Sequence, residues 1–202
     1  MPASAGGLVV AVDAGTLDNE AAEHLLHRLD TVLAAVPGLP WPSDLASTHV
    51  VPDPEPHTAV VVAWSGAALA APEVQRLLTE ALPEAGVVVT PAGDPTGPPA
   101  RVDGAGAALA QHRERRAGRL ARFPGQQEVE RRLSVADVVS LSCVDAVEAL
   151  AGTEVGPETR LDLTGFVRPT WRAGRCVVLV QPSAGDLVPF ESRHQIPCCS
   201  DH

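Results

Sequence analysis

Residues 8–36 read LVVAVDAGTLDNEAAEHLLHRLDTVLAAV, an apolar run followed by a segment with helical periodicity. The run at 8–12 is continuously apolar, which is typical of a buried strand. Four apolar residues then recur at helical spacing, namely Leu25, Leu29, Val32 and Val36. Thr16 or Asp18 is suited to cap this helix, and the Pro-Gly pair at 37–38 ends it. The stretch therefore predicts a strand followed by a helix.

Two more apolar runs, at 59–64 and 86–90, predict further strands in the first half of the chain. A helix from Pro72 to Leu82 is predicted between them, and the proline-rich residues 37–57 are predicted to be a loop. Strands that alternate with helices indicate a small three-stranded βαβαβ unit with a parallel sheet.

Residues 91–100, PAGDPTGPPA, have the composition of a linker. They predict a division into an acidic α/β unit at 1–92 and a second part at 101–202, in which helices precede a β region with a Cys/His tail. A single compact domain is the alternative organisation.

Three helices are predicted at the start of the second part, over 105–123, 126–133 and 135–150. Ser134 with Asp137 gives the last of them a capping signal, and Cys143 is predicted to face the core from it. Residues 160–167 and 175–181 predict two strands of a hairpin. The expected fold class is mixed α/β and α+β: the βαβαβ unit, central helices and a short C-terminal antiparallel β region.

The composition indicates a globular protein, since 45% of the 202 residues are hydrophobic. The longest apolar runs are too short to cross a bilayer, and no positively charged region precedes the apolar residues near the N-terminus. We therefore expect a cytoplasmic protein without a transmembrane segment, in which the four cysteines are thiols or ligands. All fifteen basic residues are arginine, as is typical of GC-rich bacterial genomes.

Charge is distributed unevenly along the chain. Residues 1–100 carry twelve acidic residues against two arginines, whereas 111–133 carry seven arginines against three glutamates. This contrast predicts attraction between the two segments, or a surface that docks a protein partner. A formal net charge of −10 argues against nucleic-acid binding.

The chain ends in ESRHQIPCCSDH, residues 191–202, where His194, Cys198 and His202 follow one another at intervals of four. Cysteine and histidine are the usual ligands of zinc, and both also suit Cu(I). Adjacent Cys198 and Cys199 point to opposite sides of an extended chain, so Cys176 is a further candidate ligand. The tail predicts a zinc or copper site, with Arg193 supporting it, in an accessory or homeostatic protein.

Two other interpretations of the tail stay open. Chain ends are commonly frayed, and Cys198 and Cys199 can equally be small buried hydrophobic residues. The chain would then be a non-catalytic protein-interaction module that binds no metal. Alternatively, Cys198 and Cys199 form a redox-active pair whose thiolates Arg193 and His194 favour, which would make the chain a thiol redox protein.

Leu163-Thr-Gly-Phe-Val167 and the segment Arg193-x-x-Ile196-x-Cys198-Cys199 resemble a family of bacterial proteins encoded beside membrane permeases. The C-terminal part of that family looks like an OB-type β-barrel with an LTGFV strand. The resemblance covers about forty residues. It implies a partly OB-like β region and a link to metal homeostasis or to a membrane-associated partner.

Asp13-x-Gly15-Thr16, after the first strand, resembles the first phosphate motif of actin-like ATPases and sugar kinases. In such a site Asp13 would position magnesium, and Gly15 and Thr16 would approach phosphate. Those enzymes need two large lobes, which 202 residues cannot build, so an ordinary strand-to-helix turn is predicted instead. No glycine-rich phosphate loop and no G-x-S-x-G motif occurs, and the sequence assigns no enzyme class.

Overall fold

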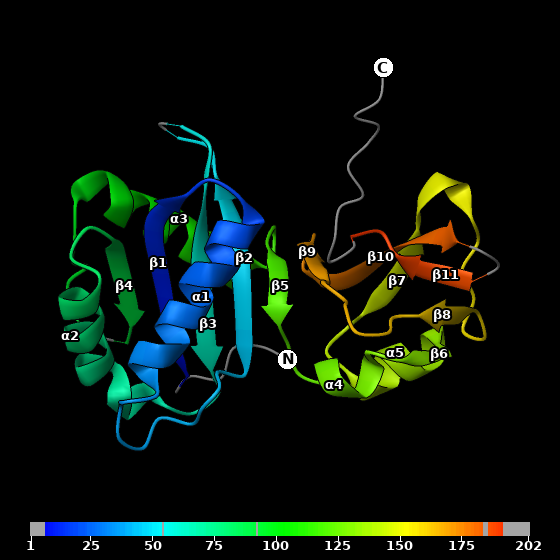
Figure 1. The fold of residues 1–202 in the computed structure, drawn as a ribbon, viewed down its shortest axis with the longest axis horizontal. Helices are drawn as coiled ribbons and strands as arrows, with labels where there is room; N and C mark the ends of the chain where they lie inside the picture. Colours follow the sequence, from blue (N-terminus) through cyan, green and yellow to red (C-terminus); the bar gives the residue numbers. More distant parts are fainter. Residues whose placement is uncertain (1–6, 54, 92, 184–185, 192–202) are drawn as a thin grey trace. The chain divides into compact units, whose positions relative to one another are not determined.

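The computed structural model describes residues 7–53, 55–91, 93–183 and 186–191. The chain forms two compact units, Met1–Phe123 and Pro124–His202 (Figure 1). The division predicted at 91–100 therefore lies too early in the sequence. Helix α3 (Pro99–Glu114) begins within that segment and packs on the sheet of the first unit, so it belongs to the first unit.

The first unit contains five strands and three α-helices within the described residues. They are β1 (Leu8–Thr16), α1 (Asn19–Leu33), β2 (Leu45–Val51), β3 (His57–Trp64), α2 (Ala71–Ala81), β4 (Gly86–Thr90), α3 and β5 (Arg119–Arg122). The strand order is β4-β1-β3-β2-β5, and every neighbouring pair is antiparallel. Up to β4, this is the split βαβ topology, in which β3 lies between β1 and β2.

The predicted parallel sheet is therefore wrong, and the reason is strand β2. Its residues were expected to be part of a proline-rich loop, but β2 pairs with β3 along its whole length, from Leu45 opposite Ala63 to Val51 opposite His57. Because an extra strand separates α1 from β3, the direction of β3 is reversed relative to β1. The three apolar strands and the helix capped by Asp18 are found where they were predicted.

The two faces of this sheet are covered by different helices. Helices α1 and α2 lie on one face, and α3 lies on the other (Figure 1). Large side chains of β1 and β3 form the core under α1 and α2: Leu8, Val10, Val12, Val60, Val62 and Trp64. Small residues let α3 approach the opposite face closely, among them Ala105 and Ala108 of the helix and Ala11 and Ala59 of the strands. Polar side chains lie at both ends of this second interface.

The second unit consists of short elements. They are α4 (Gln126–Val129), β6 (Arg132–Ser134), α5 (Val135–Leu141), β7 (Ala146–Ala149), β8 (Arg160–Asp162), β9 (Thr170–Arg172), β10 (Arg175–Ser183) and β11 (Asp186–Pro189). The strand order is β9-β10-β11-β8-β6, and β7 pairs in parallel with β10. The β8–β11 pair is also parallel, and the other pairs are antiparallel. The implied OB-type barrel stays a prediction.

Several helices predicted in the middle of the chain are shorter than expected. Arg115 adopts a left-handed conformation at the end of α3, and Gly118 has a φ of 127°, so the chain turns into β5 instead of continuing as a helix to 123. Helix α5 keeps the capping box of Ser134 and Asp137 but ends at Leu141. Cys143 therefore lies in a loop before β7 and is half-buried, and its predicted helical position is wrong.

The LTGFV segment at 163–167 is not a strand. Strand β8 ends at Asp162, whose carboxylate accepts hydrogen bonds from the backbone N–H and the hydroxyl of Thr164. These bonds and the positive φ of Gly165 turn the chain. The hairpin predicted nearby is present, but it joins β9 to β10 through Ala173 and Gly174. The mixed α and β class is confirmed, and none of the helices in the described ranges is long and apolar enough to cross a membrane.

Candidate functional site

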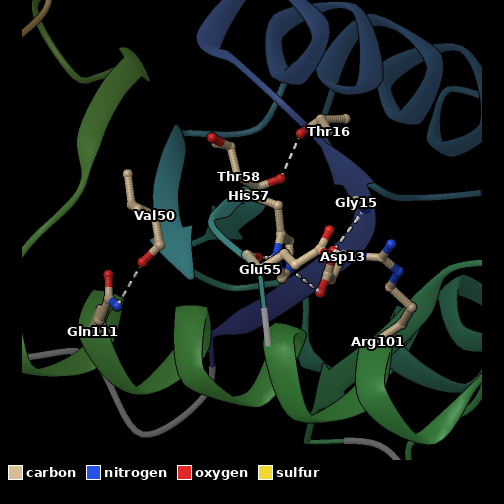
Figure 2. Close-up of polar contacts among 9 residues, drawn as sticks. All are labelled: Asp13, Gly15, Thr16, Val50, Glu55, His57, Thr58, Arg101 and Gln111. Carbon is tan, nitrogen blue, oxygen red and sulfur yellow. Dashed lines mark hydrogen bonds and ion pairs between the residues drawn. The ribbon is translucent and has the colours of Figure 1, made fainter. Parts of the chain in front are cut away.

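The first polar cluster lies at one end of the interface between α3 and the sheet (Figure 2). Asp13 of β1 has no exposed side-chain surface, and its Oδ2 atom lies 2.7 Å from Nε2 of His57 on β3. Its Oδ1 atom accepts a hydrogen bond of 2.8 Å from the backbone N–H of Gly15 and a longer one of 3.4 Å from Arg101 of α3. The buried carboxylate is therefore surrounded by donors.

Both ring nitrogens of His57 lie within hydrogen-bond distance of protein oxygens. Its Nδ1 atom lies 2.7 Å from the backbone carbonyl oxygen of Glu55, which can only accept. Its Nε2 atom faces the Asp13 carboxylate, which already accepts two hydrogen bonds on its other oxygen. Both ring nitrogens are thus engaged by protein oxygens, and His57 and Asp13 form a buried hydrogen-bonded pair.

Glycines allow this cluster to pack. A side chain at Gly104 of α3 would overlap Oδ2 of Asp13 and crowd the His57 ring, and a side chain at Gly15 would overlap the guanidinium of Arg101. Gly15 also has a φ of 67°, which favours glycine. Because Asp13 is engaged by protein groups on both oxygens, the structure gives it no role as a magnesium ligand. The expected strand-to-helix turn accounts for Asp13, Gly15 and Thr16.

A second polar cluster connects β2 to the last turns of α3. The hydroxyl of Ser47 lies 2.9 Å from Nε2 of His49 and 3.3 Å from Nδ1 of His112. His49 Nδ1 lies 3.3 Å from the side-chain oxygen of Gln111, whose amide donates to the Val50 carbonyl at 3.1 Å. One direction of hydrogen-bond donation satisfies all four of these contacts. His112 donates to Ser47, Ser47 to His49, His49 to Gln111, and Gln111 to the Val50 carbonyl. Both histidines are then neutral.

The environment of these histidines favours the neutral form. Burial lowers the pKa of His49 from 6.5 to about 4, and the neighbouring His112 contributes to the shift. Burial likewise lowers the pKa of His112 to about 4, with Arg115 and Arg113 adding to the effect. Gly118 closes the cluster, because a side chain there would overlap the His49 ring. Ser47 and His49 are completely buried, whereas Gln111 and His112 are half-buried, so the network extends from the sheet to the protein surface.

Acidic and basic segments of the first unit pair with each other. Arg119 and Arg122 of β5 form ion pairs with Glu23 and Asp30 of α1, at 2.7 and 2.5 Å. Two arginines of the segment 111–133 therefore pair with acidic residues of the same unit. This is the attraction that the charge contrast in the sequence predicted.

The second unit brings two cysteines together. Cys176 of β10, one of the predicted metal ligands, is completely buried, and its Sγ atom lies 4.0 Å from that of Cys143. No disulfide joins them. The Cys143 N–H donates to the carbonyl oxygen of Pro124, and the Cys176 N–H donates to the Asp145 carboxylate. The backbones that carry the two sulfurs are therefore both held by hydrogen bonds.

The other predicted ligands, His194, Cys198, Cys199 and His202, lie outside the described residues, as does Arg193. Within the described part of the chain, no three His, Cys, Asp or Glu side chains form a group that could hold a metal ion. Cys143 was not named as a candidate ligand because it was predicted to face the core from a helix. Its proximity to Cys176 follows from the pairing of β7 with β10, which the sequence did not predict.

Comparisons with known proteins identify no relative. No family model matches the sequence, and no curated protein and no solved structure matches it either.

Proposed function

We propose that the chain binds a thiophilic metal ion, Zn²⁺ or Cu⁺, in an accessory or homeostatic role. Cys143 and Cys176 supply two sulfur ligands, and the C-terminal segment supplies the others from His194, Cys198, Cys199 and His202. The observation that carries the proposal is the 4.0 Å separation of the Cys143 and Cys176 sulfurs.

This separation suits a shared metal ion. Two thiolates with Zn–S bonds of about 2.3 Å in a tetrahedral site lie roughly 3.8 Å apart. The two sulfurs need to move by only a few tenths of an ångström to reach that distance. Cys143 is half-buried, and Cys176 beside it is completely buried.

The direction of the chain at its last described residues favours the tail as the source of further ligands. Strand β11 runs antiparallel to β10, with Pro189 opposite Val180, and the Phe190 N–H donates to the Leu179 carbonyl. The chain thus runs towards the Cys176 end of β10, three residues away from Leu179, or about 10 Å. Cys198 is the seventh residue after Glu191, and seven residue steps can span up to about 25 Å. Two tail residues with the two thiolates complete a four-ligand site.

Metal content tests the proposal. Untagged protein purified without chelator is incubated with Zn²⁺, desalted and analysed by elemental mass spectrometry, alongside Cys143→Ser/Cys176→Ser and Cys198→Ser/Cys199→Ser. We expect about one equivalent in the unchanged protein and a loss in both variants. An equivalent retained in Cys143→Ser/Cys176→Ser would overturn the role of the sulfur pair. Circular dichroism of each variant establishes that it is folded.

A further inference from the structure

We infer that Cys143 and Cys176 are a disulfide-forming pair that reacts with low-molecular-weight disulfides such as oxidised glutathione. Neither the sequence motifs nor the tail cysteines carry this inference, which rests on the contact of the two sulfurs in the second unit. Its consequence for metal binding, that oxidation releases the ion, rests on the proposed function.

The sulfurs already lie close to bonding distance. A disulfide bond is about 2.05 Å long, so the 4.0 Å separation must shorten by about 2 Å. Cys143 can supply most of this movement, because it lies in the loop between α5 and β7. Cys176 stays in place, because β10 pairs with β9 on one side and β7 on the other.

The difference in burial between the two cysteines determines which of them reacts first. The half-buried Cys143 meets the external disulfide first, and its thiolate attacks one sulfur to form a mixed disulfide and release one glutathione thiolate. Cys176, which is completely buried, then attacks Sγ of Cys143, and its proton passes to the departing glutathione sulfur. The second glutathione leaves as a thiol. Two protein sulfurs are oxidised, and one glutathione disulfide is reduced to two thiols.

Metal binding and disulfide formation exclude each other. The thiolate is the form of cysteine that binds metal, and neither sulfur is a thiolate once the bond has formed. A metal ion held by both sulfurs would in turn protect Cys143 from attack. The pair therefore makes metal retention depend on the redox state of the surrounding thiol pool.

The test uses Cys198→Ser/Cys199→Ser, in which Cys143 and Cys176 are the only cysteines, together with the unchanged protein. Each metal-free protein is incubated with oxidised glutathione under native conditions, and the products are analysed by intact mass and peptide mapping. We expect the loss of two hydrogen atoms and a crosslinked peptide containing Cys143 and Cys176 in both proteins. A stable glutathione adduct on Cys143, or two unreacted thiols, would overturn the inference. The matched control carries Cys176→Ser together with Cys198→Ser/Cys199→Ser, and it should stop at the glutathione adduct.

The same reaction on Zn²⁺-loaded unchanged protein, followed with a chromogenic chelator, separates the two proposals. Zinc release in step with the crosslink supports both. A crosslink in a protein that holds no zinc from the outset supports the disulfide and overturns the proposed function. Zinc that stays bound after the crosslink has formed overturns the exclusion between metal and disulfide.

Discussion

Nε2 of His57 lies 2.7 Å from Oδ2 of Asp13, and the Asp13 side chain has no contact with solvent. This buried pair joins β1 to β3 directly beneath α3, where Gly104 leaves it room. Since a buried charge is tolerated only when it is paired, the two residues depend on each other.

Replacement of His57 by alanine leaves the Asp13 carboxylate buried without its main partner. We expect a loss of about 3–5 kcal/mol in the free energy of unfolding, measured by urea denaturation. Arg101→Ala is the control, because this partly exposed side chain makes only a 3.4 Å contact with Asp13, and less than about 1 kcal/mol should be lost. Equal losses in the two variants would show that the pair has no special role.

Two glycines of α3 give opposite predictions. Alanine in a helix interior is normally more stable than glycine by up to about 1 kcal/mol. Gly106→Ala should show this gain, because an added side chain would meet nothing within 4 Å. Gly104→Ala should instead be destabilising, because the same methyl group would overlap Asp13. Thermal melting of the two variants measures both effects. A higher melting temperature in both variants would show that α3 does not pack closely against Asp13 at Gly104.

The histidine network predicts a dependence of stability on pH. His49 and His112 take up protons near pH 6.5 in the unfolded chain but only near pH 4 in the folded protein. Between these values the unfolded chain binds more protons, so stability decreases as the pH falls. For each histidine, the free energy of unfolding decreases by up to about 1.4 kcal/mol per pH unit as the pH falls through this window. The decrease levels off below about pH 4.

Urea denaturation at several pH values measures this effect. The variant His49→Gln/His112→Gln should lose much of the decrease in stability between pH 6.5 and 4. His24→Gln should keep it, because His24 is 74% exposed on α1. If the double variant and His24→Gln gave the same slope, the network would not be the source of the pH dependence.

The sequence predicted the elements of the first unit better than their arrangement. Continuous apolar runs predicted β1, β3 and β4 because these strands are buried on both faces. Strand β2 was missed because its buried positions include the polar residues Ser47 and His49. These two side chains can be buried because His112 and Gln111 of α3 lie within hydrogen-bond distance of them. A hydrogen-bond network between segments that are distant in sequence produces no local sequence pattern. Without β2, the predicted sheet was parallel, whereas the observed sheet is antiparallel.

Of the two sulfurs in the proposed metal site, the sequence analysis named only Cys176. Cys176 was chosen for its residue type, and its partner Cys143 lies 33 residues away in sequence. That contact arises from the parallel pairing of β7 with β10, in which Ala146 lies opposite Val177. Short parallel strands joined by long connections have no signature in the local sequence, so the pair became visible only in the folded unit.

The most direct test of the metal proposal is a titration of the reduced, metal-free protein with Cd²⁺, in which absorption from thiolate-to-cadmium charge transfer is recorded. The account predicts that this absorption rises to a limit at about one equivalent, and that Cys143→Ser/Cys176→Ser loses most of it while remaining folded. A limit at one equivalent with unchanged intensity in that variant would contradict the account, because the tail cysteines would then bind the ion without the Cys143–Cys176 pair.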